Sequence, residues 1–425
     1  MTVDSWTARV LDAVDDSAPE LVTFLADLVR MPSVGGTDVE NDAQQHLAGV
    51  FDRIGLQVDH WLLPLPELIA EPEFPGAEVD RDEAWGLVGR LPGRGRGRSL
   101  MLNGHIDVVP PGDPKTWTGR DPYSARLDGG RMYGRGACDM KAGLTAALFA
   151  VQALARCGVP LEGDVLLASV QGEEDGGLGT YALIRRGWRA DACVIPEPTG
   201  LDIVPATAGA LTFRLHVPGR ATHAARRTSG VSAIEKFWPI WRALSALERD
   251  RNARVDPLVA RWDVAYPISV GVLRGGEWAS TVPEVLVAEG RLGVALDEPV
   301  AAARADLERA VAQACDADPW LRDNPVHVEW WGGAFAPGRL PGHSDLVQRV
   351  TSAHAQVSAR SPQTWAAPYG SDLRLLTNLA GVPTLHYGPG DGALAHGPDE
   401  SVSLDEVLAC TRVLALLALD ICRVV

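Results

Sequence analysis

Short apolar runs alternate with amphipathic stretches along the first half of this 425-residue chain, and the alternation restricts the folds open to it. Apolar runs bounded by turn residues predict buried strands, and apolar residues at helical spacing predict helices. Strands that alternate with helices favour an α/β fold with a mostly parallel sheet, which presents functional groups at the carboxyl ends of its strands. The expected strands are 56–63, 99–103, 164–170 and 192–195, and the expected helices are 18–30, 41–54, 141–157 and 179–186.

A stretch with a different order interrupts this pattern, and a chain of this length also needs more than one core. The order there is β-α-β-β-α-β, with strands at 210–217, 268–273, 285–296 and 326–331 and helices at 231–251 and 299–317. The α/β character then resumes, with a strand at 383–387 and a helix at 404–419. We therefore predict a discontinuous α/β catalytic domain, 1–207 and 333–425, and an inserted ferredoxin-like α+β domain, 208–332.

The formal net charge of −16 bears on the partners of the chain. Such a charge repels nucleic acid and anionic membranes at long range, so we expect neither as a partner. The local exception is the run Gly-Arg-Gly-Arg-Gly-Arg at 93–98, which lies between strand-like runs at 85–88 and 100–102. We expect this run to form the solvated loop of a hairpin.

The cysteines and the N-terminal segment predict a location. Six cysteines without framework spacing, in a chain too long to need staples, indicate reduced thiols. Residues 1–31 are acidic and lack the basic start and continuous apolar stretch of a secretory signal, and no apolar run reaches membrane-spanning length. We expect a cytoplasmic protein.

Five short segments carry the histidine and carboxylate side chains that a two-zinc hydrolase needs. Most of them follow an apolar run that predicts a buried strand. One such segment alone is typical of a strand end or an acidic surface, but the whole set indicates a metal site. The segments are Gly104-His105-Ile106-Asp107, Gly136-Ala137-Cys138-Asp139-Met140-Lys141, Gly172-Glu173-Glu174-Asp175-Gly176-Gly177, Pro196-Glu197-Pro198-Thr199 and Ala395-His396-Gly397-Pro398-Asp399-Glu400.

The charges of the candidate ligands balance those of two zinc ions. Asp139, Glu174 and Glu197 supply three negative charges, and a bridging hydroxide supplies the fourth. Neutral His105 and His396 add none. A cluster without net charge avoids a large desolvation penalty when it is buried.

Two further carboxylates each have a task at such a site. Asp107 follows His105 by two residues and can accept its imidazole N–H, which fixes the tautomer and raises the basicity of the ligand. Glu173 precedes Glu174, and adjacent carboxylates in a loop can point apart, one to metal and one to water. We expect Asp107 to orient His105 and Glu173 to be the general base.

These motifs resemble those of the dinuclear zinc amidohydrolases and peptidases, the family of acetylornithine deacetylase, succinyl-diaminopimelate desuccinylase, aminoacylase and glutamate carboxypeptidase. The resemblance covers essentially the whole chain and is carried by residues 102–110 and 133–143 together with the three later segments. It implies two Zn²⁺ per chain, with Co²⁺ or Mn²⁺ able to replace them. It assigns one zinc to His105 and Glu197, the other to Glu174 and His396, and the bridging position to Asp139.

The resemblance also assigns roles outside the metal ligands. The inserted domain would be a lid and a dimerisation domain, so we expect a homodimer. His223 would reach an active site, which in dimeric members of the family is the active site of the neighbouring subunit. Arg374 lies in a motif that matches a substrate loop, where it would clamp a carboxylate in bidentate fashion. Ser280 stands where many members have an Asn near the substrate, so their specificity does not transfer directly.

We expect a hydrolase that cleaves the amide bond of a small N-acylated amino acid, with water activated by metal and Glu173, and with His223 and the metals stabilising the oxyanion. Two alternatives use the same chemistry. One is a dipeptidase or carboxypeptidase, and the other is a deformylase of N-formyl heterocyclic amines, for which Trp262, Tyr266 and Trp278 would supply an aromatic pocket. A non-catalytic ligand-binding relative is the least favoured alternative, because neither the base nor a ligand is lost.

Overall fold

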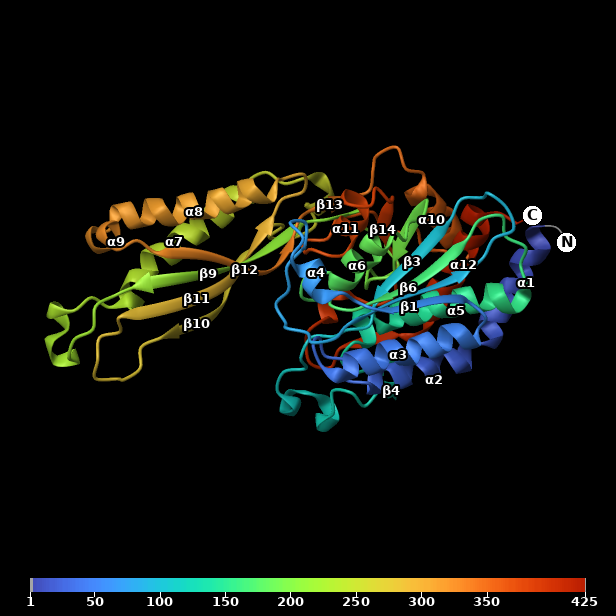
Figure 1. Ribbon diagram of the computed structural model, residues 1–425, viewed down its shortest axis with the longest axis horizontal. Coiled ribbons are helices and arrows are strands. Elements are labelled where there is room, and N and C mark those ends of the chain that lie inside the picture. Colours follow the sequence, from blue (N-terminus) through green and yellow to red (C-terminus); the bar gives the residue numbers. More distant parts are fainter. Residues whose placement is uncertain (1–2, 425) are drawn as a thin grey trace. The chain divides into compact units, whose positions relative to one another are not determined.

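The computed structural model describes residues 3–424, which form two compact units (Figure 1). Unit 2 consists of Thr207–Gly338 and Ala366–Gly370, and unit 1 of the other described residues. The insertion thus extends beyond the expected end at residue 332, because its last strand runs on to Phe335. A second short segment, 366–370, also joins it.

Unit 1 is built on a six-stranded sheet in the order β1-β2-β6-β3-β7-β14. The last four strands of that order run parallel, which confirms the mostly parallel sheet. Strand β2 runs antiparallel to them, and β1 pairs antiparallel with β2 at the edge. The expected hairpin around residues 93–98 is wrong, because β6 lies between β2 and β3 and pairs with both. The strands are β1 (Gln57–Leu62), β2 (Trp85–Leu91), β3 (Leu100–His105), β6 (Val165–Val170), β7 (Ala192–Ile195) and β14 (Thr384–His386).

The sheet separates two apolar cores because successive side chains of a strand point to opposite faces. Leu100 and Leu102 of β3 belong to one core and Met101 to the other. The larger core contains side chains of α2, α5 and α12, and the smaller one contains those of α6 and α11. The helices of unit 1 are α1 (Val3–Asp16), α2 (Ala18–Arg30), α3 (Asp38–Arg53), α4 (Leu65–Ile69), α5 (Ala142–Cys157), α6 (Leu178–Arg186), α10 (Leu346–Ala355), α11 (Leu373–Asn378) and α12 (Leu404–Cys422).

Helix α5 is buried along almost its whole length. Together with the turn before it, residues 137–157, it is long and apolar enough to cross a membrane by length and composition, contrary to our expectation for this chain. Its side chains pack into the larger core of unit 1, as those of a core helix do. The helix begins at Ala142, three residues after Asp139, whose carboxylate lies beside His105 at the end of β3.

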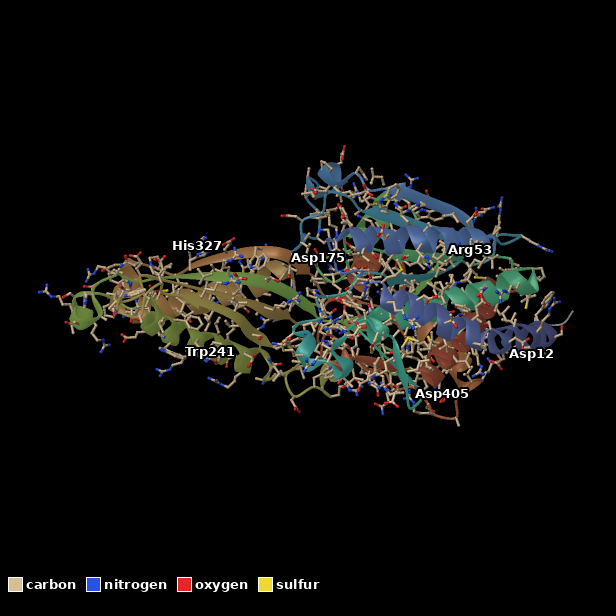
Figure 2. The ribbon with its side chains drawn as sticks, turned by 90° about the horizontal axis from the view of Figure 1, so that it is seen from below. Asp12, Arg53, Asp175, Trp241, His327 and Asp405 are labelled. Atoms are coloured by element: carbon tan, nitrogen blue, oxygen red, sulfur yellow. The ribbon has the colours of Figure 1, made fainter. Side chains whose placement is uncertain are left out.

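Unit 2 has the predicted β-α-β-β-α-β order and an antiparallel sheet in the order β10-β11-β9-β12, which is the ferredoxin-like arrangement. Two long helices pack on this sheet, and Phe213, Ile240 and Leu307 lie in the core between them. Figure 2 labels Trp241 on the first of these helices and His327 on the last strand. The elements are β9 (Gly209–Pro218), α7 (Ala233–Arg251), β10 (Ile268–Gly275), β11 (Val285–Val294), α8 (Val300–Ala317), α9 (Pro319–Asp323) and β12 (His327–Phe335).

A small antiparallel sheet of unit 1 joins segments that lie far apart in the sequence. Its order is β15-β5-β4, with Ser401 opposite Tyr133 and Ser403 opposite Arg131. This pairing brings the motif that contains Asp139 beside the motif that contains His396. The strands are β4 (Arg126–Asp128), β5 (Arg131–Tyr133) and β15 (Ser401–Ser403), and two further short strands are β8 (Ala206–Thr207) and β13 (Gly338–Arg339).

The parallel strands explain why the motifs meet. His105 is the last residue of β3 and lies opposite Val170, the last residue of β6, so the loop after β6 starts beside it. Glu197 follows β7, the next strand along the sheet. The carboxyl ends of parallel strands lie at one edge, so the candidate ligands converge there.

A close contact fixes Glu197 relative to α5 and generates a prediction. A β-carbon added at Gly143 would lie 1.8 Å from the carbonyl oxygen of Pro196. We expect Gly143→Ala to lower the free energy of unfolding by about 1–3 kcal/mol through overpacking, although alanine favours a helix by about 1 kcal/mol. Chemical denaturation of the full chain measures this change.

The matched control is Gly49→Ala in the exposed part of α3. The nearest atom to the added carbon is Nη1 of Arg53 at 3.4 Å, which belongs to a flexible side chain. Here the helix propensity of alanine acts alone, and the free energy of unfolding should rise by up to about 1 kcal/mol. Two variants of equal stability would show that the Gly143–Pro196 contact imposes no constraint.

Candidate metal centre

The carboxylate of Asp139 lies between two imidazoles. Its Oδ1 is 3.2 Å from Nε2 of His105, and its Oδ2 is 3.4 Å from Nε2 of His396. The two oxygens of one carboxylate therefore face the donor nitrogens of two different histidines. This is the arrangement that a carboxylate bridging two metal ions requires.

A glutamate accompanies each histidine. Oε2 of Glu174 is 3.1 Å from Nε2 of His396, and Oε1 of Glu197 is 4.0 Å from Nε2 of His105. Ligand atoms of His105, Asp139 and Glu174 lie within 4.8 Å of one another. The structure thus brings together all five metal ligands expected from the sequence, as two histidine–glutamate pairs on either side of one aspartate.

The electrostatics of these side chains fit a pair of divalent cations. Burial, and then the charge of Asp139, raises the pKa of both Glu174 and Glu197. The charge of Glu174 is the main cause that raises the pKa of His396 to about 11. Crowded carboxylates call for positive charge, and nitrogen and oxygen donors of this kind suit zinc.

The side chain of Asp107 binds the loop that contains Glu173 and Glu174 rather than the ring of His105. The Nδ1 atom of His105 lies 2.9 Å from the main-chain oxygen of Asp107 but 3.7 Å from its carboxylate, which is too far for a hydrogen bond. The carboxylate instead accepts the amide N–H groups of Glu173 at 3.3 Å and Glu174 at 3.2 Å. Asp107 therefore orients the imidazole through its backbone, which corrects the expected role of its side chain.

Glu173 has the environment of a general base. Its side chain is buried beside the ligands, and burial followed by the charge of Asp372 raises its pKa well above the ordinary value. A carboxylate with a raised pKa takes up a proton more readily than an exposed one. The geometry agrees with the expected role, because Glu173 and the ligand Glu174 leave the same short loop.

Arg81 and Glu40 hold this loop from outside, and the sequence did not indicate either residue. Arg81 donates to Oε2 of Glu40 at 3.0 Å and to Oδ2 of Asp175 at 3.0 Å, and all three side chains are buried. Glu40 also accepts the amide N–H of Gly172 at 3.1 Å. Their signal in the sequence is weak, because Glu40 lies in an ordinary helix and Arg81 in a loop far from every motif.

Arg374 contacts the same loop, and its geometry differs from that of a carboxylate clamp. The side chain is buried, with Nη1 donating to the main-chain oxygen of Ser371 and Nη2 to that of Gly176, both at 2.7 Å. These two atoms form the planar fork that the motif led us to expect at a substrate carboxylate. In this structure the fork binds main-chain oxygens instead.

His223 and Ser280 lie side by side in unit 2. The backbones of His223 and Thr281 form a β-bridge, and the main-chain oxygen of Ser280 accepts the N–H of Ala224 at 2.8 Å. Nδ1 of His223 accepts the N–H of Ala225 at 3.1 Å, so Nε2 is the ring nitrogen left to carry the proton. Both side chains are exposed, so these two expected substrate contacts share one surface.

Comparisons with known proteins agree with this centre. Residues 101–420 match the model of peptidase family M20/M25/M40. N-formyl-4-amino-5-aminomethyl-2-methylpyrimidine deformylase of Bacillus subtilis (strain 168) is 28% identical and aligns over 94% of both chains. Succinyl-diaminopimelate desuccinylase of Gluconacetobacter diazotrophicus is 30% identical over 95% of this chain and 97% of its own.

A solved structure shares this fold. The crystal structure of an M20 family metallo-carboxypeptidase, Sso-CP2 from Sulfolobus solfataricus, superposes with a TM-score of 0.74 at 17% identity, over 94% of this chain and 98% of that one. The family match and the relative at 30% identity confirm the resemblance seen in the motifs. The chain belongs to peptidase family M20/M25/M40, and it is a metal-dependent hydrolase of amide bonds.

Proposed function

We propose that this protein hydrolyses the amide bond between a short acyl group, formyl above all, and a heterocyclic amine, at a centre of two zinc ions. The observation that carries the reaction is the carboxylate of Asp139, whose two oxygens face His105 and His396 separately. Buried Glu173, next to a ligand, supplies the base. Neither base nor ligand is missing, which disfavours a non-catalytic binding protein.

The residues divide the work of the reaction. One ion would be held by His105 and Glu197, and the other by Glu174 and His396. Asp139 would contact both ions. Bound metal would supply polarisation of the scissile carbonyl and activation of water. Glu173 takes a proton from the attacking water and delivers it to the nitrogen as the C–N bond breaks, so that the amine leaves neutral and the acyl group leaves as a carboxylic acid, which then loses its proton to solvent.

The choice of substrate depends on Arg374. An N-acyl amino acid has a free carboxylate that needs a cation, and the guanidinium assigned to it binds two main-chain oxygens. An N-formyl heterocyclic amine has no such need. The relatives from Bacillus subtilis and from Halalkalibacterium halodurans, at 28% and 27% identity, are named deformylases of this kind.

Deacylation of an N-acyl amino acid, our first expectation from the sequence, remains the second candidate. The desuccinylase of Gluconacetobacter diazotrophicus, at 30% identity, favours it. Purified zinc-loaded protein assayed on N-formyl aminopyrimidines, N-acetyl and N-succinyl amino acids and dipeptides separates the two candidates. Preferred turnover of the amino acid derivatives would reject the deformylase proposal.

Unit 2 is proposed as the lid and the dimer interface of a cytoplasmic homodimer. His223 is exposed, and because its Nδ1 accepts from Ala225, its Nε2 is suited to donate to the developing oxyanion. In a dimer it would do so from the neighbouring subunit. Ser280, beside it, would contact the substrate through its hydroxyl.

We expect two zinc ions per chain in zinc-saturated protein, because two cations offset the carboxylates that surround His105 and His396. Elemental analysis of the dialysed protein measures the ratio. Glu174→Ala removes one ligand of a single half-site and should lower the ratio to one. A ratio that stays at one in both proteins would exclude the second ion.

We expect Glu173→Gln to retain the fold and both zinc ions but to lose activity by about 10²–10⁴-fold, which is the usual effect of removing a general base. The amide has nearly the same shape as the carboxylate and takes up no proton at neutral pH. Initial rates with the best substrate of the panel measure the loss. Activity within about threefold of the parent would remove Glu173 from the proton path.

We expect Arg374→Lys to lower kcat/KM equally for substrates with and without a carboxylate. A single ammonium nitrogen cannot reproduce the bonds to Ser371 and Gly176, and the loss of a hydrogen bond from a charged group costs about 1.5–3 kcal/mol. The exposed Arg30 provides the control, since Arg30→Lys should leave both series unchanged. A loss confined to carboxylate substrates would restore Arg374 as a clamp.

A further inference from the structure

A buried ion pair lies directly behind the candidate metal centre. Nη1 of Arg135 is 2.5 Å from Oε2 of Glu400, and both side chains are almost completely excluded from solvent. Arg135 follows β5, and Glu400 precedes β15, the strand paired with β5. Both residues stand in the motifs that predicted the centre, yet neither had a role there.

Each member of the pair also binds the main chain of a ligand segment. Oε1 of Glu400 accepts the amide N–H groups of Cys138 at 2.9 Å and of Asp139 at 3.0 Å. Nη2 of Arg135 donates to the main-chain oxygen of His396 at 3.0 Å. One ion pair therefore connects the backbone of Asp139 to the backbone of His396.

His396 needs such support more than the other ligands do. Its φ of 61° lies in the left-handed region, which a residue with a β-carbon rarely adopts. Its side chain is also 52% exposed, whereas that of His105 is 1% exposed. His105 is held by β3 and by the main-chain oxygen of Asp107, with no contact to Arg135 or Glu400 among the described hydrogen bonds.

We propose that Arg135 is a positioning residue that sets the affinity of one of the two metal sites, the one formed by His396 and Glu174. The inference rests on the proposed dinuclear centre. The asymmetry follows from the contacts, because Arg135 binds the backbone of His396 and contributes nothing to the placement of His105 and Glu197. Glu400 binds the amide of Asp139, which serves both ions, so the selectivity is expected of Arg135 alone. Loss of the Arg135 side chain should therefore weaken the binding of one ion and leave the other in place.

Zinc titration of the metal-free, full-length protein in competition with a chromophoric chelator tests this. The parent should bind two ions. Arg135→Met should bind the first with an affinity within about threefold of the parent and the second about 10–100-fold more weakly, the usual effect of removing a group that orients a ligand. Unchanged affinity for both ions in the folded variant would overturn the proposal.

Arg131→Met is the matched control. Arg131 joins the same two segments, donating to the hydroxyl of Ser401 at 3.2 Å and to its main-chain oxygen at 3.0 Å. It makes no described hydrogen bond to a ligand residue, so the variant should bind both ions as the parent does. An equal loss of the second ion in Arg131→Met would show that general loosening of the small sheet is the cause, and would overturn the proposal.

A second variant covers the case in which Arg135→Met does not fold. Arg135→Lys keeps a positive charge against Glu400, but one ammonium nitrogen cannot replace the fork that spans Glu400 and the oxygen of His396. It should show the same selective loss, and parent-like affinity would overturn the proposal. A parent protein that binds fewer than two ions would instead reject the dinuclear centre itself, so the two failures are distinguishable.

Discussion

Two buried carboxylates, each bound to a pair of consecutive backbone amides, hold the rest of the centre in place. Asp107 accepts the N–H groups of Glu173 and Glu174, and Glu400 accepts those of Cys138 and Asp139. Hydrogen bonds to a charged acceptor are stronger than neutral ones, which suits them to fixing loops. The candidate ligands stay close together despite the repulsion between their carboxylates, because these hydrogen bonds hold their backbones in place.

The architecture could be predicted from the sequence because it depends on local patterns. The helix at 18–30 and the strand at 192–195 were predicted with the bounds that the structure has, and the order of elements in the insertion was correct. The neighbours of β2 could not be predicted. Strand order is decided by packing between distant segments. Here β2 and β3 are consecutive in the chain, but β6, which lies far downstream, separates them in the sheet.

The candidate ligands could be predicted for a different reason, since metal chemistry admits few side chains and motifs place them at strand ends. The hydrogen-bond partners that a side chain takes inside the protein are less restricted by chemistry. The sequence shows that Arg374 and Asp107 stand near the centre, but an arginine fork fits a main-chain oxygen as well as a carboxylate, and an aspartate accepts from an amide as well as from an imidazole. Arg81 lies in a loop without a motif, so its signal in the sequence was too weak to find it.

The discontinuity of unit 1 has a consequence for how the protein is made. A ribosome delivers His105, Asp139, Glu174 and Glu197 before it begins unit 2, and delivers β14 and His396 only after unit 2 is complete. Until then β7 is an open sheet edge, of the kind that recruits other strands. The nascent chain therefore carries four of the five candidate ligands and an unpaired sheet edge through the synthesis of a whole second unit, and β14 and then His396 complete the sheet and the ligand set.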